Sequence, residues 1–328
     1  MSKEETLPGD DLTWAGDRRR GCLLGLAIGD ALGAAVEFRP PGTFPLVTGY
    51  RAGGPHNIDA GQWTDDTSMA LALADSIGEK GWNLHDQMTK YVAWWQEGKY
   101  GVNGWCFDIG GTTRDSLSKF LHDQRPVLEC SDSTEGASGN GSIMRLAPVA
   151  IKYHNWFLDD MPSFSTIADD SSRTTHSSPQ CRSACRYLAT VLAGLIHGER
   201  KEVVLDSEWH GLQSLLKSGP LHPLIQRVAD GSYKTKTELT IRGAGWVVQS
   251  LEAALWAFWN TNSFEEAVLK AVNLGDDSDT TGAVCGQLAG AYWGESGIPE
   301  HLLSGLARRD MIETALTSLM GKKDNVSE

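Results

Sequence analysis

Apolar residues recur at helical spacing along most of the 328-residue chain, and no stretch alternates between apolar and polar residues as a half-buried strand would. We therefore predict an all-α fold, a single compact orthogonal helical domain whose long loops carry the polar chemistry. The expected helices cover residues 17–38, 68–77, 84–97, 112–121, 164–173, 179–197, 221–230, 243–260, 263–274, 282–293 and 299–320.

The pattern of polar residues places the ends of this domain. Residues 1–16 are polar and acidic, and we expect them to form a flexible N-terminal segment. The helical domain is expected to span residues 17–321, and residues 322–328 are expected to form a flexible C-terminal tail.

The first expected helix carries many small residues, which permit close approach of a second helix, and it reads as the central buried helix. Asp30 lies in its apolar middle and needs a partner if it is buried. Glu37 lies at its C-terminal end, before a loop rich in proline and glycine. Glu37 can be a general base or a gate that moves with this loop, or simply an exposed carboxylate at a helix end. Loops as long as residues 39–62 usually have a function.

The segment Asn273–Gly282 concentrates three carboxylates and three hydroxyls in one turn between two apolar helical stretches. Neighbouring carboxylates repel one another unless a cation lies between them, and hard divalent cations prefer oxygen ligands. Asp and Ser also cap helices, and a helix begins near Asp279, so capping is the alternative interpretation. One aspartate would serve as a cap, whereas this turn contains three within four residues.

A second acidic turn, Thr64–Thr67, also precedes an amphipathic helix. Capping by Thr64 or Asp65 is again the alternative interpretation. If the two helix N-termini converge, their carboxylates and hydroxyls provide enough ligands for two cations. Such paired metals polarise a substrate oxygen and activate water.

Three further loops give weaker signals. Asp108 lies in a glycine-rich turn before a helix that Thr112 or Thr113 would cap, and a lone aspartate there is usually a turn former. The loop at Gly139–Gly141 can present backbone N–H groups to a phosphate, but it lacks the lysine and the preceding strand of a nucleotide-triphosphate loop. His176 precedes a proline-initiated helix, and a single histidine is more often structural than catalytic.

Composition excludes several classes of protein. The net charge is −13 and the sequence pI is about 5.1, which argues against binding of nucleic acid or of an anionic membrane. The apolar stretch after Cys22 is interrupted by Asp30 and is too short to span a bilayer. Six cysteines form no CxxC pair, and the chain begins without a signal-peptide pattern, so we expect a cytoplasmic protein without a zinc site.

Taken together, these segments resemble the ADP-ribosylglycohydrolase family, which includes dinitrogenase reductase-activating glycohydrolases and ADP-ribosylarginine hydrolases. The matching segments occur in the same order from about residue 21 to residue 294. They are residues 25–33 with Glu37, residues 64–67, residues 108–110, residues 139–141 with Met144 and Arg145, Thr175 and His176 with Pro179, and Gly275 with residues 277–282.

The resemblance implies an all-α fold with a binuclear site for Mg²⁺ or Mn²⁺ at helix N-termini and loops. On the matching positions, the metal ligands would be Thr64, Asp65, Asp66, Asp277, Asp279 and Thr280. The catalytic residues would be Glu37, Asp66 and Asp108. The substrate would contact Gly110, Gly111, Gly139, Asn140, Gly141, Ser142, Met144 and His176.

The chain departs from the family pattern at three positions, of which Ser278, in place of a common threonine or alanine, should be harmless. Asp276 stands where relatives often have glycine, so we leave it out of the ligand set and interpret it as a cap or an additional charge near the metals. Gly111 stands where the dinitrogenase reductase type often has asparagine.

The function that the resemblance implies is removal of ADP-ribose from a modified protein side chain, with arginine as the expected linkage and free ADP-ribose as the product. Two alternatives remain open. One is hydrolysis of O-linked ADP-ribose, on serine or in another conjugate. The other is a catalytically silent protein that only binds ADP-ribose.

Overall fold

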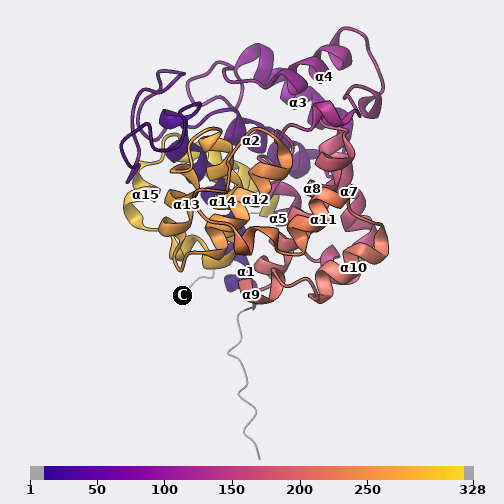
Figure 1. The fold of residues 1–328 in the computed structure, drawn as a ribbon. Helices are drawn as coiled ribbons and strands as arrows, with labels where there is room; N and C mark the ends of the chain where they lie inside the picture. Colours follow the sequence, from indigo (N-terminus) through magenta and orange to yellow (C-terminus); the bar gives the residue numbers. More distant parts are fainter. Residues whose placement is uncertain (1–10, 321–328) are drawn as a thin grey trace, which may run out of the picture.

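The computed structural model describes residues 11–320, which fold into helices joined by loops (Figure 1). Within this range two isolated β-bridges occur and no β-strand, so the all-α prediction is confirmed. The α-helices are α1 (Asp11–Gly33), α2 (Asp65–Lys80), α3 (Leu84–Glu97), α4 (Gly111–Leu121), α5 (Ala147–Tyr153), α6 (Trp156–Asp159), α7 (Met161–Arg173), α8 (Pro179–Ile196), α9 (Lys201–Val204), α10 (His210–Ser218), α11 (Pro223–Ala229), α12 (Val247–Trp259), α13 (Phe264–Val272), α14 (Ser278–Trp293), α15 (Glu300–Gly305) and α16 (Arg309–Met320). Short 3₁₀ turns are η1 (Ala34–Val36), η2 (Val127–Glu129), η3 (Glu135–Ala137), η4 (Ser232–Thr235) and η5 (Glu295–Gly297).

Several helix boundaries differ from the expected ones. The first helix begins at Asp11, six residues before the expected start, so residues 11–16 of the expected flexible N-terminal segment are helical. The rest of that segment, residues 1–10, and the expected C-terminal tail at residues 322–328 lie outside the described part of the chain. Helix α2 begins at Asp65, three residues early, because two carboxylates are favourable in the first turn of a helix. Helix α10 was not expected, and α12 begins only at Val247 because the residues before it pair with the Gly139 loop.

Helices α1 and α14 cross in direct backbone contact at the centre of the molecule. A Cβ atom added to Gly286 would lie 2.5 Å from the carbonyl carbon of Gly25, and one added to Gly282 would lie 2.9 Å from that of Gly29. Helices α12 and α13 pack on the remaining sides of α14, which is buried along nearly its whole length. The small residues in both helices therefore allow the two backbones to lie in contact.

This crossing brings the C-terminal end of α1 to the N-terminal end of α14. The Ser278 hydroxyl donates a hydrogen bond of 2.9 Å to the carbonyl of Gly33. Glu37 follows α1 directly, and Asp277 and Asp279 open α14, so carboxylates far apart in sequence lie at the same end of the helix pair.

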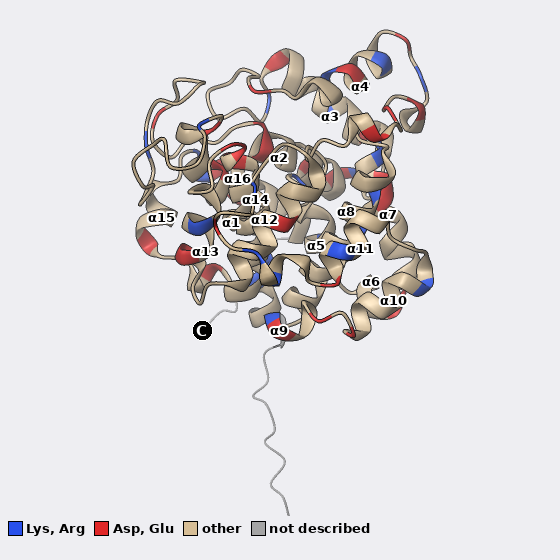
Figure 2. Cartoon of the chain, in the orientation of Figure 1, with Lys and Arg blue, Asp and Glu red and all other residues tan. Residues whose placement is uncertain are grey.

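Acidic and basic residues are interspersed along the helices and loops (Figure 2). Of the helices within residues 11–320, none combines the length and apolar character that crossing a membrane requires.

Candidate functional site

Asp30 anchors the N-terminus of α2 to the middle of α1. Its buried carboxylate accepts hydrogen bonds from the backbone N–H of Thr64 at 2.9 Å and of Thr67 at 3.0 Å. The hydroxyls of the same two threonines lie 3.0 Å and 2.6 Å from its oxygens. Asp30 thus has the partners that its burial demands, and it fixes the turn that carries Asp65 and Asp66.

The two acidic turns predicted from the sequence converge. The Thr64 hydroxyl lies 3.0 Å from Asp30 Oδ1, 3.2 Å from Asp66 Oδ2 and 3.1 Å from Asp279 Oδ2. The Thr280 hydroxyl lies 3.4 Å from Asp66 Oδ2. One hydroxyl has a single hydrogen to donate, so it cannot satisfy three carboxylate oxygens at once.

Asp277 and Asp279 complete this cluster from the start of α14. Asp277 occupies the N-cap position without a capping side-chain bond, and its Oδ2 accepts 2.9 Å from the Asn140 amide. The backbone N–H of Thr280 donates to Asp279 Oδ1 at 2.9 Å. The alternative interpretation of both acidic turns, side-chain capping, is not supported, because Thr64 and Asp277 occupy the N-cap positions without capping hydrogen bonds.

Burial and mutual repulsion raise the pKa of the clustered carboxyls. Desolvation, followed by the charges of neighbouring acids, raises the pKa of Asp65, Asp66 and Asp279 well above the ordinary value. Burial likewise raises the pKa of Asp277, and it raises that of Asp30 to about 6. Among the described residues, no cationic side chain forms an ion pair with any of these five carboxyls, so a cation bound between them would lower their pKa.

A divalent cation fits this donor set. Asp66 Oδ1 is buried and has no hydrogen-bond partner among the described residues. Two sets of three carboxylates each bring one oxygen per residue within 4.8 Å of one another. These sets are Asp30, Asp66 and Asp279, and Glu37, Asp277 and Asp279. Oxygen-only ligands of this kind suit Mg²⁺, Mn²⁺ or Ca²⁺.

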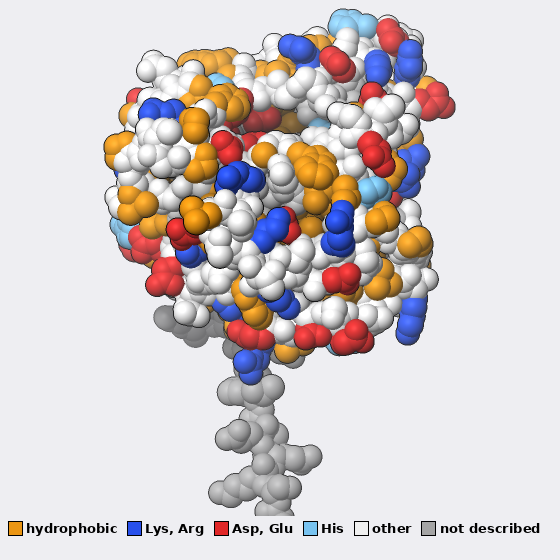
Figure 3. Space-filling view, viewed as in Figure 1, with side chains coloured by type: hydrophobic (Ala, Val, Ile, Leu, Met, Phe, Trp, Pro, Cys, Tyr) orange, Lys and Arg blue, Asp and Glu red, His pale blue; other side chains and the backbone are white. Residues whose placement is uncertain are grey.

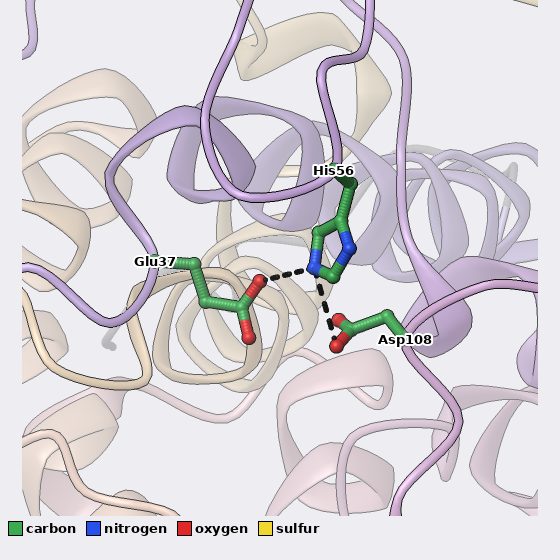
Figure 4. Close-up of side chains that lie close together, drawn as sticks. All are labelled: Glu37, His56 and Asp108. Carbon is green, nitrogen blue, oxygen red and sulfur yellow. Dashed lines mark hydrogen bonds and ion pairs between the residues drawn. The ribbon is translucent and has the colours of Figure 1, made fainter.

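Glu37 and Asp108 lie on either side of His56 (Figure 4). His56 Nε2 is 2.9 Å from Glu37 Oε2 and 3.2 Å from Asp108 Oδ1. The hydrogen bonds that His56 Nε2 donates to Asp108 and Glu37 raise the pKa of His56 to about 10, and burial raises the pKa of Glu37 to about 7. Glu37 is buried rather than an exposed helix-end residue. His56 was missed by the sequence analysis, because a lone histidine in a Pro/Gly loop carries no periodic or motif signal.

A cavity of about 260 Å³ opens above the acidic cluster. In the space-filling view it is a hollow with acidic and histidine side chains inside it and hydrophobic side chains along its lower rim (Figure 3). Its lining includes Glu37, Phe38, Asp65, Asp108, Gly110, Gly111, Thr112, Thr113, Gly139, Asn140, Gly141, Met144, His176, Gly245, Asp277, Asp279 and Thr280.

Three predicted site residues lie behind this lining. Thr64, Asp66 and Ser142 are completely buried, and the Ser142 hydroxyl accepts 3.0 Å from Ser172 rather than facing the cavity. Helix α4 begins at Gly111 with Gly110 at its N-cap, so the expected threonine cap is wrong. Phe38 and Gly245 line the cavity but were not predicted, since neither belongs to a polar motif.

Asp276 stands just outside the cluster. Its φ of 54° is in the left-handed region, which glycine adopts freely and aspartate tolerates. The N-cap of α14 is Asp277, so the interpretation of Asp276 as a cap is wrong.

Comparison with known proteins places this site in a family. The sequence profile of the ADP-ribosylglycohydrolase family matches residues 11–327. An ADP-ribosylarginine hydrolase Tri1 from Pseudomonas putida is 38% identical, over 95% of this chain and 80% of its own length. The ADP-ribosyl-[dinitrogen reductase] glycohydrolase of Rhodospirillum rubrum is 30% identical, over 88% of this chain and 90% of its own length.

A solved structure agrees with these matches. A chain of an ADP-ribosylglycohydrolase-related protein complex superposes with a TM-score of 0.80 at 39% identity, covering 94% of this chain and 98% of that one. The resemblance predicted from the motifs is confirmed. The chain belongs to the ADP-ribosylglycohydrolase family and is a glycohydrolase enzyme.

Proposed function

We propose that this enzyme is a metal-dependent hydrolase that cleaves the N-glycosidic bond between ADP-ribose and an arginine side chain of a modified protein. Free ADP-ribose and the unmodified arginine are the products. The family membership supports the ADP-ribosyl substrate, and a relative at 38% identity carries the name of an ADP-ribosylarginine hydrolase.

Two divalent cations, Mg²⁺ or Mn²⁺, are part of this proposal. Their ligands would be Thr64, Asp65, Asp66, Asp277, Asp279 and Thr280. Within this set, Asp66 Oδ1 has no hydrogen-bond partner among the described residues, and the hydroxyls of Thr64 and Thr280 lie 3.2 Å and 3.4 Å from Asp66 Oδ2. When bound, the cations would supply positive charge that polarises substrate oxygens and lowers the pKa of a bound water.

The pair of carboxylates around His56 carries the arginine assignment. Glu37 and Asp108 already hold one cationic ring between them, with both oxygens within 3.2 Å of its Nε2. A guanidinium is a planar cation with five N–H donors, so it can replace one ring N–H by several hydrogen bonds to the same carboxylates. A serine hydroxyl brings no positive charge to this pair and gains less from it.

Asp66 and Asp108 are the two carboxylates proposed to take a proton from the attacking water, and Asp108 is the better placed. Its carboxylate lines the cavity, whereas Asp66 lies beneath the lining and is completely buried. In the proposed step, water adds to the anomeric carbon and passes a proton to Asp108 while the carbon–nitrogen bond breaks. The departing guanidine keeps the bonding electron pair and then takes up that proton. Nearby carboxylates stabilise the oxocarbenium-like centre as positive charge develops.

The glycine-rich part of the cavity lining is proposed to hold the rest of ADP-ribose. Glycine and amide groups dominate there, and their backbone N–H groups suit phosphate oxygens. The residues assigned to this side are Gly110, Gly111, Gly139, Asn140, Gly141, Met144 and His176, all of which line the cavity. Ser142 lies behind the lining, so its contribution would be through the loop that it supports.

Hydrolysis of defined conjugates tests the proposal. ADP-ribosylarginine, ADP-ribosylserine and O-acetyl-ADP-ribose are compared side by side with Mg²⁺ or Mn²⁺. We expect turnover of the arginine conjugate, and we expect EDTA or Asp277→Ala to abolish it. Absence of arginine turnover beside turnover of the serine conjugate would transfer the assignment to the O-linked class. Binding of ADP-ribose without any turnover would favour the silent binder, and release that survives both EDTA and Asp277→Ala would refute the metal.

A further inference from the structure

Arg145 is a completely buried cation directly beneath the loop Gly139–Gly141, which lines the cavity and is called the glycine loop below. Its Nη1 donates 2.8 Å to the carbonyl of Gly141. Its Nη2 lies 3.0 Å from the Thr174 hydroxyl and 2.7 Å from the Thr175 hydroxyl. Among the described residues no carboxylate forms an ion pair with Arg145. Its guanidinium is held by hydroxyl and carbonyl oxygens and lies 4.8 Å from the centroid of the Tyr91 ring.

The Thr175 hydroxyl links this guanidinium to His176. The hydroxyl oxygen lies 2.8 Å from His176 Nδ1, and both side chains are buried. Arginine has no acceptor atom, so Thr175 Oγ must accept from Arg145. The only other partner of that oxygen among the described residues is His176 Nδ1, so the Thr175 hydrogen is free to point at the ring nitrogen.

The opposite hydrogen-bond direction is unfavourable. If His176 Nδ1 carried the proton, the Thr175 hydroxyl would accept from both neighbours and its own hydrogen would have no acceptor. A buried donor without a partner costs about 1–3 kcal/mol. The arrangement therefore leaves Nδ1 bare and places the single ring proton on Nε2.

The Nε2–H group faces the cavity. His176 lines the cavity beside the glycine loop, and a Cβ atom added to Gly141 would lie 3.0 Å from Nε2. Nε2 has no hydrogen-bond partner within residues 11–320, and the backbone N–H of Gly141 has none either. The ring N–H of His176 and the backbone N–H of Gly141 are thus two donors without acceptors in the part of the cavity that Gly139 and Gly141 keep open.

We propose that Arg145 and Thr175 are positioning residues that hold His176 as the neutral Nε2–H tautomer, so that its ring donates to an oxygen of the ADP-ribose diphosphate. This role rests on the proposed function, because it takes ADP-ribose as the ligand of the cavity. Arg145 also fixes the Gly141 carbonyl away from the ligand, so one buried cation orients both the glycine loop and the ring.

The charge state of the ring agrees with this role. Burial, followed by the charge of Arg145, lowers the pKa of His176 to about 3, so the ring is neutral at physiological pH. A neutral imidazole has one donor and one acceptor nitrogen, and its tautomer therefore decides whether it attracts or repels a phosphate oxygen.

Two neighbouring threonines allow a matched experiment. Thr175→Val removes the hydroxyl that contacts both Arg145 and His176. Thr174→Val is the control, because Thr174 is equally buried and also accepts from Arg145 Nη2 but has no hydrogen bond to His176. Thr175→Ser restores a hydroxyl at the same position. Urea unfolding of all three variants and of the wild-type full chain first checks that each variant is folded and measures how far its stability differs.

The first readout is the tautomer of His176, measured by long-range ¹H–¹⁵N correlation of its ring in the ligand-free protein. We expect a bare Nδ1 and a protonated Nε2 in the wild type, Thr174→Val and Thr175→Ser, and a mixture of tautomers in Thr175→Val. A protonated Nδ1 in the wild type, or an unchanged spectrum in Thr175→Val, overturns the proposal.

The second readout is ADP-ribose binding by titration calorimetry in the presence of Mg²⁺. Loss of a hydrogen bond from His176 to the charged diphosphate should weaken ADP-ribose binding to Thr175→Val roughly tenfold. Thr174→Val and Thr175→Ser should keep the wild-type affinity. Equal loss in both valine variants would reduce Thr175 to a merely structural role and refute the proposal.

The proposed function can fail separately. If the wild type binds ADP-ribose but hydrolyses no conjugate, the catalytic assignment fails while both readouts still apply. If the wild type does not bind ADP-ribose, the ligand assignment and the proposed hydrogen bond to its diphosphate fail together, and the ring spectra alone decide whether the tautomer is held.

Discussion

The crossing of α1 and α14 can be tested by one added methyl group. Gly286→Ala places a Cβ atom 2.5 Å from the carbonyl carbon of Gly25, whereas ordinary contact begins at 3.4 Å. The obstacle is helix backbone, which cannot rotate aside as a side chain can. The two helices must therefore separate locally by about 1 Å in a core that is otherwise closely packed.

Two opposing effects set the size of the change. Alanine is a better helix former than glycine by about 1 kcal/mol. Overpacking of a filled core costs about 1–3 kcal/mol, and the rigid backbone contact puts Gly286→Ala at or above the upper end. We expect a net loss of roughly 2 kcal/mol in the free energy of unfolding, and lower activity because α1 and α14 carry opposite walls of the acidic cluster.

Gly16→Ala is the matched control. Gly16 also lies within α1, but no atom lies within 4 Å of its added Cβ. Only the helix-propensity effect applies there, so this variant should gain up to about 1 kcal/mol. Urea unfolding measures the change in the free energy of unfolding for both variants, provided that its dependence on urea concentration has the same slope as in the wild type. If Gly286→Ala were stabilised as much as Gly16→Ala, the close crossing and its role in placing the carboxylates would be refuted.

Three other perturbations have definite signs. Asp30→Asn offers one acceptor oxygen to the donors of Thr64 and Thr67, so we expect about 1–3 kcal/mol less stability in urea; an unchanged midpoint would show that Asp30 does not anchor α2. Burial lowers the pKa of His154 to about 4, so between pH 6.5 and 4 only the unfolded chain binds that proton. The free energy of unfolding should therefore decrease as the pH is lowered through this range, by at most about 1.4 kcal/mol per pH unit. The decrease should be smaller in His154→Gln, and equal slopes in the two proteins would contradict this role of His154. EDTA should lower the melting temperature, since a cation at 100 times its Kd stabilises by about 2.7 kcal/mol; no change would argue against a bound metal around Asp66.

The sequence was most informative where chemistry and periodicity coincide. The acidic turns at Thr64–Thr67 and Asp277–Thr280 each precede an apolar helix, and this predicted their positions at helix N-termini. The sequence left their convergence open. It depends on Asp30, which holds the Thr64–Thr67 turn, and on the crossing of α1 and α14, which joins residues more than 200 positions apart. The family motifs supplied that long-range information.

What the sequence could not provide is the set of contacts made by irregular loops. His56 reaches Glu37 and Asp108 from a segment whose path depends on the isolated bridge between Gly53 and Ile58. Helical periodicity carries no information on such a path. For the same reason, the motif at Gly139–Ser142 did not reveal that its glycines face the cavity while its serine faces away.

Asp276 shows how a departure from the family pattern can leave the site intact. Its backbone N–H donates 2.8 Å to the carbonyl of Arg39, and its carbonyl accepts 2.7 Å from the N–H of Phe38. These two bonds tie the loop after Glu37 to the turn before Asp277, and they need only the left-handed backbone that aspartate also tolerates. Because the tie is made by backbone atoms, replacing glycine by aspartate preserves it. Any movement of the loop after Glu37 must then either break these two hydrogen bonds or carry the turn before Asp277 with it. The position of Glu37, which is proposed to contact the arginine, is therefore mechanically coupled to the carboxylates of the proposed metal site.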